Sequence, residues 1–521
     1  MVGLRLSIVG LCLLMIALPA RGANILGLFS SHSPSHLILH MSMIKTLAEN
    51  GHNVTVVTMM KPKVTHKDIH VIVVPMTDEQ EEIMEAQMNE MAGQKSSAFD
   101  TMRRLMSGMS VMIDSQLELL SDPRFQRIYE TKFDLMFMGY FINDFQLGVA
   151  AKLQVPVIIS WMQAPMFAVD ELVGNPNLGT PLARGEKMSF AKRLQNLGME
   201  VLVRTMWSIF DRRLERYYNQ QFGHEDNFPT LAEMKRNVSM LFTNSHSLSE
   251  GPIRPLVPAV AEIGGIQVKE QPDPLPEDIA KFLEKAQNGA ILLSLGTNIK
   301  STAVKPELVQ SIFKVLSGLK QHVIWKWEDL DNTPGKSANI LYKKWLPQVD
   351  ILAHPKIKLF INHAGRGGIT EAQYHGVPML ALPIFGDQPG NAENMQKAGY
   401  GVALDLLQLN EENFKANIHE VLNNKQYAQT IGQFSQLYRD RPLTAKQTVL
   451  YWTDYVLRHK GAPHLQSPAV HMSTVAYHNL DVYAVLAAAL SLVLILTWLA
   501  LKFTCRKLCG KSKTSKKVKR Q

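Results

Sequence analysis

The chain has 521 residues, of which 46% are hydrophobic and 19% are charged, and its formal net charge is +9. A chain of this length exceeds a single core and predicts two domains or more. The last twenty residues contain nine Lys or Arg and no acid, so the preceding 501 residues sum to zero. This distribution excludes a basic nucleic-acid-binding domain, and with it nucleic acid as a partner.

The N-terminus has the pattern of a signal peptide. Arg5 precedes the apolar run Leu6–Leu18, and Ala20-Arg21-Gly22 follows it. This order predicts a signal peptide over residues 1–22, with cleavage after Gly22. The apolar run is shorter than the ~20 residues that a spanning helix needs.

The next stretch alternates strands with helices. A helix is expected from about His36 to Glu49, ended by Asn50-Gly51. Strands are expected at residues 25–29, 54–58, 71–74, 135–137 and 157–159. The alternation predicts an α/β domain with a parallel sheet over residues 23–270. It stops between about residues 161 and 228, where a Met-rich stretch fits either an adaptable apolar pocket or loosely packed core helices.

A second series of the same kind follows a proline-rich segment. Gln271–Pro276 has three prolines in six residues, which favours a linker at residues 271–284. Strands are then expected at residues 291–293, 323–325, 340–342, 358–361, 379–382 and 402–404. These predict a second α/β domain over residues 285–460. Two doubly wound domains form a cleft at the carboxyl ends of their strands, where ligands bind.

The C-terminal region has the pattern of a membrane anchor. A juxtamembrane segment at residues 461–481 precedes Val482–Leu501, which is uncharged and long enough to cross a bilayer. The basic tail, residues 502–521, is expected in the cytosol by the positive-inside tendency, and the body across the membrane. Lys517 and Lys519 lie five and three places from the end, as in the dilysine signal of endoplasmic reticulum proteins. The chain is therefore expected to be a single-pass type I protein of that membrane.

The cysteines and glycosylation motifs agree with this topology. Cys12 lies in the signal peptide, whereas Cys505 and Cys509 lie in the tail, so the body needs no disulfide. Two Asn-X-Ser/Thr motifs, at Asn53 and Asn237, lie in the part expected to be lumenal. Their occupancy is left open.

A phosphate-binding turn is the strongest chemical motif. His363 ends an apolar run and is followed by small residues at Ala364, Gly365, Gly367 and Gly368. A helix N-terminus with exposed amides suits an anion, and glycines let the backbone approach it. The alternative is an ordinary strand-to-helix turn with a hydrogen-bonded histidine. The chain has neither a dinucleotide glycine triplet after its first strand nor a Walker sequence, which argues against NAD and ATP enzymes.

The surroundings of this turn carry a family resemblance. Trp345-Leu346-Pro347-Gln348, His363-Ala364-Gly365, Glu371, Gly376-Val377-Pro378 and residues 383–388 occur in order. This series resembles the signature of the UDP-glycosyltransferases, and the resemblance extends from signal peptide to tail, closest to the insect branch. It implies an α/β fold of the GT-B type, with two Rossmann-like domains facing a cleft.

The resemblance also implies roles at the donor site. Ser294, Gly296 and Thr297 stand where the family's donor domain opens, and Trp345 stands where the uracil is held. Gln348, in the same motif, is also expected to bind the donor. His363 and the amides of Gly365, Gly367 and Gly368 would bind phosphate, Glu371 the ribose, and Asp387 and Gln388 the sugar hydroxyls. The ordinary alternatives are a core aromatic for Trp345, an exposed helix residue for Glu371 and a turn for Asp387-Gln388.

The catalytic base is expected in the first domain. The family's histidine after the first strand corresponds to His36, with His32 and His40 as competitors, and a neutral imidazole suits a general base. A carboxylate normally orients this base. Strict register places Gly139 at that carboxylate's position, and Asp144, five residues further on, is the nearest acid.

These observations predict a transferase that moves a hexose from a UDP-sugar to a hydroxyl of a small lipophilic acceptor, with inversion. The UDP-sugar is a co-substrate, and neither a permanent cofactor nor a metal is expected, because no Asp-x-Asp ends a strand of the donor domain. The rival hypothesis is a non-catalytic UDP-sugar-binding subunit. The sequence leaves open the acceptor, UDP-glucose against UDP-glucuronate as donor, and a homo- or hetero-oligomer.

Overall fold

The structure is a computed structural model that describes residues 22–93, 98–176, 188–249, 253–298 and 300–514. The chain divides into one unit that ends at Gln466 and a second that begins at Ser467. The predicted signal peptide, up to residue 21, and the lysine pair Lys517 and Lys519 lie outside the described residues.

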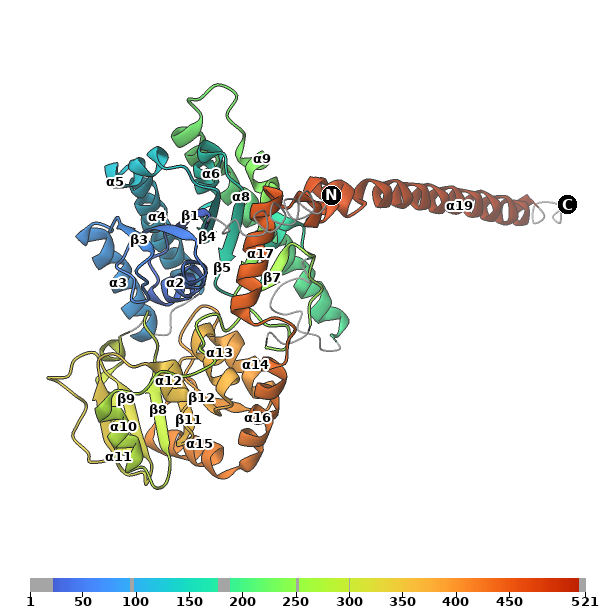
Figure 1. The fold of residues 1–521 in the computed structure, drawn as a ribbon. Helices are drawn as coiled ribbons and strands as arrows, with labels where there is room; N and C mark the ends of the chain where they lie inside the picture. Colours follow the sequence, from blue (N-terminus) through green and yellow to red (C-terminus); the bar gives the residue numbers. More distant parts are fainter. Residues whose placement is uncertain (1–21, 94–97, 177–187, 250–252, 299, 515–521) are drawn as a thin grey trace, which may run out of the picture. The chain divides into compact units, whose positions relative to one another are not determined.

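The first unit contains a seven-stranded parallel sheet with the order β3-β2-β1-β4-β5-β6-β7 (Figure 1). Its strands are β1 (Asn24–Phe29), β2 (Asn53–Thr58), β3 (Ile69–Val73), β4 (Leu135–Gly139), β5 (Val157–Trp161), β6 (Val238–Thr243) and β7 (Val260–Glu262). The strand order reverses between β1 and β4, which pair from Ile25 with Leu135 onward. In doubly wound sheets this is the place where ligands bind.

Helices cover this sheet on both faces. They are α2 (Pro34–Glu49), α3 (Asp78–Gly93), α4 (Ala98–Ser121), α5 (Pro123–Gln126), η1 (Arg127–Glu130), η2 (Asp144–Gln146), α6 (Leu147–Leu153), α7 (Phe167–Asp170), η3 (Glu171–Val173), α8 (Phe190–Phe222) and α9 (Leu231–Arg236). Helix α8 spans 33 residues in the region where the sequence shows no clean periodicity. Only Leu214, Tyr218 and Phe222 of α8 are buried, so its C-terminal part alone joins the core.

The first unit also contains a six-stranded parallel sheet with the order β10-β9-β8-β11-β12-β13. Its strands are β8 (Ala290–Ser294), β9 (His322–Lys326), β10 (Ile340–Lys343), β11 (Ile357–Asn362), β12 (Met379–Ala381) and β13 (Gly401–Ala403). Its helices are α10 (Glu277–Glu284), η4 (Ser301–Ala303), α11 (Pro306–Ser317), α12 (Gln348–Leu352), α13 (Arg366–His375), α14 (Gln388–Lys397), η5 (Leu406–Gln408), α15 (Glu411–Asn423) and α16 (Lys425–Arg439). Here the order reverses between β8 and β11.

Helix α17 (Ala445–His459) returns to the first sheet. Although it follows the second sheet in sequence, its buried Val449 and Val456 belong to the apolar cluster around β1, β2 and α2. Figure 1 shows α17 beside β7, which it contacts. Helix α10 also differs from the sequence prediction, which placed a linker there. It occupies the second half of the predicted linker, because Ile279 and Leu283 pack into the core of the second sheet.

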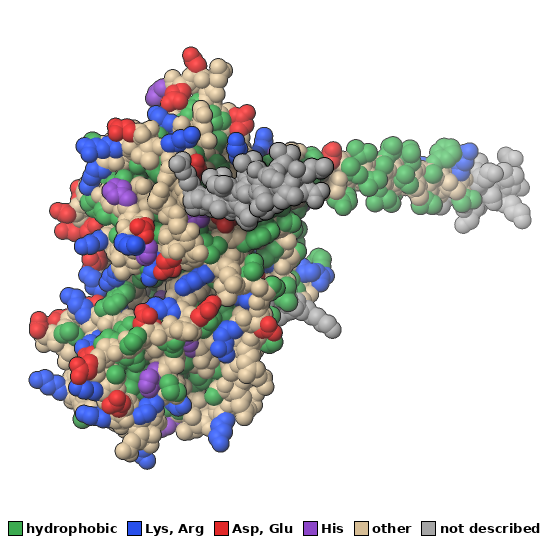
Figure 2. Space-filling model, viewed as in Figure 1, with side chains coloured by type: hydrophobic (Ala, Val, Ile, Leu, Met, Phe, Trp, Pro, Cys, Tyr) green, Lys and Arg blue, Asp and Glu red, His purple; other side chains and the backbone are tan. Residues whose placement is uncertain are grey.

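The second unit contains the long helix α19 (Leu480–Thr514), after η7 (Pro468–His471) and α18 (Thr474–Tyr477); η6 (Pro463–Leu465) closes the first unit. Within the described part of the chain, α19 is the one helix whose length and composition suit a membrane crossing, over residues 480–508. Figure 2 shows apolar side chains along its exposed surface. The predicted span, Val482–Leu501, lies inside it.

The predicted strands agree with the observed ones to within about two residues at each end. Strands β6 and β7 were not predicted. The α/β architecture with parallel sheets is confirmed.

Candidate functional site

His36 lies at the switch point of the first sheet. Strand β1 ends at Phe29, and α2 begins after the N-cap Ser33, whose hydroxyl accepts a hydrogen bond from the His36 amide. The Ser33 hydroxyl also donates to Asn298 Oδ1 at 3.2 Å, so the start of α2 contacts the loop after β8. Gln163 Nε2 lies 3.5 Å from His36 Nε2. Burial lowers the pKa of His36 to about 4, and the imidazole is therefore neutral at pH 7.

The structure does not bring Asp144 to His36. Asp144 is 2% exposed, accepts a hydrogen bond from the Tyr140 hydroxyl at 3.1 Å and pairs with Lys235 Nζ at 3.0 Å. These contacts fix the segment after β4 against α9. Its side chain thus has a structural explanation that is independent of the base.

The ring of His40 fills the space beside Gly139, the residue at the position of the family's carboxylate. Its ring stacks on Phe29, with centroids 4.3 Å apart, and its Nδ1 lies 3.1 Å from the Ser160 hydroxyl. A Cβ atom at Gly139 would lie 2.9 Å from His40 Nε2, which is too close. No acid fits at residue 139 while His40 keeps this position. His40 is only 2% exposed, which disfavours it as a base that must reach the hydroxyl of an acceptor substrate.

On the second sheet, His363 is held between two glycines. Strand β11 ends at Asn362, and the imidazole that follows lies against Gly296 after β8 and Gly365 before α13. A Cβ atom would lie 2.5 Å from the ring at Gly296 and 2.3 Å at Gly365. Burial, and then the charge of Lys326, lower the pKa of His363 to about 4. The ring is therefore a neutral hydrogen-bonding group at pH 7.

Two polar atoms at this turn are buried without a hydrogen-bond partner. They are His363 Nδ1 and Thr297 Oγ1, from the loops after β11 and β8. Helix α13 starts beside them at Gly365 without a side-chain cap, so its first amides are available to an anion. Buried unsatisfied groups are rare and often indicate an absent ligand.

The turn contains a strained residue. Ala364 has φ +60, and its amide donates to Asn362 Oδ1 at 2.7 Å. Residues with a side chain seldom adopt this left-handed conformation, and the hydrogen bond to Asn362 helps to hold Ala364 in it. The nearby Ser294 is 2% exposed, and its hydroxyl accepts weakly from the Gly296 amide at 3.4 Å.

Glu371 is buried rather than exposed. Gln348 Nε2 donates to its Oε2 at 2.7 Å, and Gln267 Nε2 donates to its Oε1 at 3.3 Å. Gln267 also donates to the Gly367 carbonyl at 3.3 Å. Burial raises the pKa of Glu371 to about 7, against the lowering effect of both glutamines. Beside it, Gly368 is close to Phe360 and Gln348.

Trp345 is a surface aromatic and not a core one. It is 43% exposed, and Lys63 Nζ from the loop after β2 lies 3.5 Å from its ring centroid. Asp387 is exposed and accepts from Asn391 Nδ2 at 2.6 Å. Gln388 is buried, and its Oε1 accepts from the amides of residues 384 and 385. The Gln388 carbonyl therefore holds the turn between β12 and α14.

Three residues that the sequence analysis did not single out lie at this site: Gln267, Lys63 and Lys326. Lys326 ends the buried strand β9 at 7% exposure and pairs with Glu328. A charged residue that directly follows the apolar run Val323-Ile324-Trp325 was an available signal for it. Gln267 and Lys63 are brought in by long-range contacts and have no local sequence signal.

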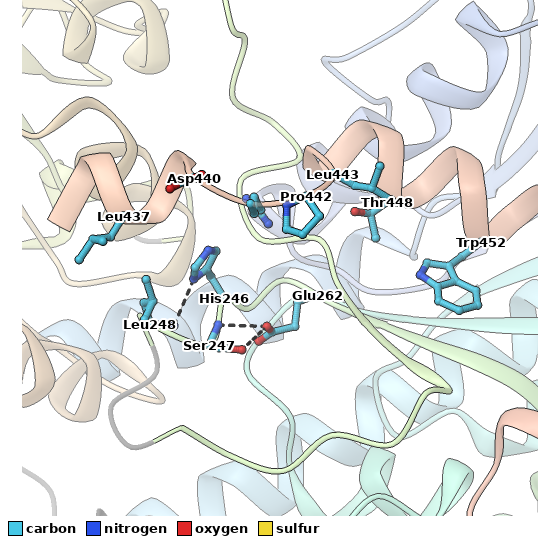
Figure 3. Close-up of a pocket in the computed structure, with 11 residues that line it drawn as sticks. His246, Ser247, Leu248, Glu262, Leu437, Asp440, Pro442, Leu443, Thr448 and Trp452 are labelled. Carbon is cyan, nitrogen blue, oxygen red and sulfur yellow. Dashed lines mark hydrogen bonds between the residues drawn. The ribbon is translucent and has the colours of Figure 1, made fainter.

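A separate pocket of about 450 Å³ lies where α16 leads into α17 (Figure 3). Glu262 there accepts from the amide and hydroxyl of Ser247, and His246 and Trp452 also line the pocket. None of the predicted site residues lines it. The described residues contain no group of three or more His, Cys, Asp or Glu placed to hold a metal ion.

The chain is similar in sequence to known proteins. A sequence model of the family described as "UDP-glucoronosyl and UDP-glucosyl transferase" matches residues 28–515. UDP-glucosyltransferase 2 of Dactylopius coccus is 33% identical over 485 residues, which cover 89% of this chain and 89% of the relative. UDP-glucuronosyltransferase 2B17 of Homo sapiens is 29% identical over 411 residues, which cover 77% and 75% of the two chains.

Solved structures resemble the chain at lower identity. The calicheamicin glycosyltransferase CalG4 matches with a TM-score of 0.53 at 15% identity, over 84% of this chain and 99% of its own. The spinosyn forosaminyltransferase SpnP matches with a TM-score of 0.54, also at 15% identity, over the same shares. At this identity the likeness concerns the fold alone.

Proposed function

Because the chain belongs to the family of UDP-glucuronosyl and UDP-glucosyl transferases, we propose that it transfers a hexose from a UDP-sugar to a hydroxyl of a small lipophilic acceptor. The chain is a UDP-glycosyltransferase, and its predicted GT-B fold is confirmed. The acceptor class, the stereochemical course and the roles of individual residues are parts of the proposal.

The unsatisfied atoms beside α13 are the observation that supports the donor site best. His363 Nδ1 and Thr297 Oγ1 are buried without partners at the point where a helix N-terminus begins. A phosphate there would accept from the hydroxyl, from the first amides of α13 and from the imidazole in its Nδ1–H tautomer. The UDP leaving group would be stabilised by the same donors as its charge develops.

The remaining donor contacts follow from position. Trp345 offers an exposed ring face to uracil, and Glu371 offers a carboxylate to the ribose hydroxyls. Asp387 and the amide of Gln388 would hold sugar hydroxyls. The UDP-sugar enters as a co-substrate, and the proposed steps use protein groups without a metal or permanent cofactor.

We assign the base to His36. Its neutral imidazole would take the proton of the acceptor hydroxyl while the oxygen attacks the anomeric carbon and UDP leaves from the opposite side, which inverts that centre. The contact of Ser33 with Asn298 places the start of α2 against the donor-side loop after β8. Asp144 belongs to the structural pair with Lys235, and Gln163 is the side chain that contacts the base.

We also place the two sheets in the lumen of the endoplasmic reticulum, with α19 as a single-pass anchor and the basic tail in the cytosol. The apolar stretch of α19 and the charges that follow it support this orientation. Under this proposal the first domain comprises residues 23–270 and helix α17, and the second domain, predicted at residues 285–460, gains α10 and loses α17. Asn53 and Asn237 are both exposed, as glycosylation would require.

The second candidate function is a UDP-sugar-binding subunit without turnover. One observation favours it: the hydrogen-bond partners that the described residues give the His36 side chain include no carboxylate. Transfer with a histidine base that has no charged partner is expected to be slower, because no carboxylate stabilises the imidazolium as it forms.

A donor and acceptor screen tests the proposal. Microsomes that contain the full-length protein are assayed with labelled UDP-glucose and UDP-glucuronate against phenols and steroids. We expect transfer with one donor, and we expect His36→Ala to lower turnover by about 10²–10⁴ while UDP affinity stays unchanged.

Asp144→Asn is the matched control. It should lower stability by about 1–3 kcal/mol, because it breaks a partly buried ion pair. Turnover per folded molecule should stay unchanged, because that pair is formed with Lys235 and not with the base. A wild-type protein that binds UDP-sugar but transfers to no acceptor would favour the binding subunit.

A further inference from the structure

Two lysines from different sheets lie at the donor site without an assigned role. Lys326 ends β9, next to the strand that leads to Thr297, and Lys63 lies in the loop after β2. The charge of Lys326 is among the causes that lower the pKa of both His363 and Lys63. The strand register places these groups close together. Lys326 is in register with Lys343 of β10, two residues before the Trp345 ring that Lys63 contacts. Strand β8, which pairs with β9, leads to Gly296, which lies against the His363 ring.

Lys326 is an unusual residue for its position. It is 7% exposed, although lysine is seldom buried without a specific partner. Its ammonium group pairs with Glu328, and the other carboxylate oxygen of Glu328 accepts from the Ser301 amide at 2.8 Å. The Ser301 hydroxyl donates to the Lys326 carbonyl at 3.0 Å. These contacts hold the lysine at the carboxyl edge of the sheet.

Lys63 reaches the same place from the first sheet. Its ammonium group lies 3.5 Å from the centroid of Trp345, the aromatic proposed to bind uracil. Burial and the charge of Lys326 lower the pKa of Lys63. Like charges held near each other destabilise a protein, and such arrangements are typical of sites that bind an anion.

The diphosphate of the donor carries the negative charge that would neutralise these two lysines. Both phosphates of a UDP-sugar are ionised at neutral pH, whereas His363, Thr297 and the α13 amides are neutral donors. Charge-assisted hydrogen bonds are roughly twice as strong as neutral ones. A site built only from neutral groups would leave the diphosphate without a counter-charge.

We propose that Lys326 and Lys63 together supply the positive charge that binds the diphosphate of the donor. This inference rests on the proposed function. Lys326 is the fixed member, oriented by Glu328, and Lys63 is the member that the first sheet contributes. A bound diphosphate would thus connect the two sheets, and a nucleoside without phosphates would not.

The test separates charge from nucleoside recognition. The full-length protein in detergent is titrated with UDP and with uridine, and the ratio of the two affinities is compared among variants. Lys326→Met is made together with Glu328→Gln, so that no carboxylate is left without its partner, and Glu328→Gln alone serves as its reference. Lys63→Met is made singly. Lys67→Met, in the same loop, and Lys344→Met, beside Trp345, remove equal charges from exposed positions.

We expect the Lys326→Met/Glu328→Gln variant to bind UDP about ten- to a hundredfold more weakly, with uridine affinity unchanged. Lys63→Met should weaken UDP binding by a smaller factor, because Lys63 is more exposed than Lys326. Glu328→Gln alone should bind UDP at least as well as the wild type, because the glutamine oxygen can still accept from Lys326 and the lysine stays positive.

Equal losses for UDP and uridine would overturn the inference, because they would show a general disturbance of the site. Unchanged UDP affinity in the double variant would overturn it as well, as would losses of the same size for Lys67→Met or Lys344→Met. The proposed function fails by a different result, namely a wild-type protein that does not bind UDP.

Discussion

The imidazole of His363 can lie at the end of β11 only because both neighbouring residues lack a side chain. Gly296 has φ +86 and Gly365 has an extended conformation, but a Cβ atom at either would overlap the ring. The glycines at this turn therefore act through the histidine as well as through access of the backbone to phosphate.

Gly365→Ala should displace the His363 ring and weaken UDP binding by about 1.5–3 kcal/mol, the range for a hydrogen bond to a charged group. Gly367→Ala is the matched control, because a Cβ atom there is 3.9 Å from its nearest neighbour. In a His363→Ala background, Gly365→Ala should cost little more, since residues that share one interaction are not additive. Calorimetric titration with UDP of the wild type, the two single variants at residues 363 and 365 and the double variant measures this additivity, and Gly367→Ala is titrated beside them. Full additivity would show that the two residues act independently.

Glu371 should make nucleoside binding depend on pH. Burial raises its pKa to about 7 in the free protein. Ribose hydroxyls that donate to the carboxylate would stabilise its charged form and lower that pKa in the complex. Affinity is therefore highest above the free pKa and falls as the pH drops through about 7. Uridine is the ligand to titrate, because it has no phosphate that ionises in this range.

Titration from about pH 5.5 to about pH 8.5 should give this decline in the wild type and a flat profile in Glu371→Gln. A wild-type profile as flat as that of the variant would mean that Glu371 does not meet the ribose. The mutation Lys67→Met, outside the site, should retain the wild-type decline.

Among the elements, those with a local signal were predictable and those fixed by distant contacts were not. The strands of both sheets are continuous apolar runs, which is why their limits were close. β7 has three residues, too few for a pattern. The N-terminal half of α8 exposes Phe190 and Leu194, so its apolar residues do not indicate a buried face.

The candidate site divides in the same way. The turn at His363 and Gly365 is local, and its sequence pattern was sufficient to find it. The partners of Asp144 come from α9, and the ring that fills the space beside Gly139 comes from α2. Neither could be read from spacing, because both depend on how separate helices pack on one sheet.

Helix α17 illustrates this dependence, since its sequence position suggests the second domain and its packing places it on the first. Val449 is completely buried against the cluster of the first sheet. Val449→Ala should reduce stability by about 1–3 kcal/mol through lost burial and a cavity. Hydrogen exchange should accelerate in α2 and β7 but not in β8 or β11. Tyr451→Ala, at an exposed position on the same helix, should change neither region.

Faster exchange in β8 and β11 after Val449→Ala would contradict this assignment. It would indicate that α17 stabilises the second sheet, or that the two sheets unfold as one cooperative unit.

For the whole molecule, the tail is expected to decide the compartment. If Lys517 and Lys519 form a retrieval signal, changing both to serine should let the full-length protein leave the endoplasmic reticulum. Acquisition of glycan processing from later compartments would report its departure. Changing Lys511 and Lys513 to serine removes the same charge from the same tail and should not release the protein. Unaltered residence of the Lys517/Lys519 variant would show that the signal lies elsewhere.

The anchor itself is testable at the boundary between the two units. A chain that ends at Gln466 retains both sheets and α17 but lacks α19. The candidate membrane span of α19, residues 480–508, is longer than the ~20 residues needed to cross a bilayer. We expect this chain to be released by a carbonate wash, whereas the full-length protein stays in the membrane fraction. The exposed face of α8 provides the competing source of membrane affinity, because Phe190, Leu194, Leu197 and Val201 recur at helical spacing. If the shortened chain still pellets, Leu194→Glu with Leu197→Glu should release it, and α19 would then not be the sole anchor.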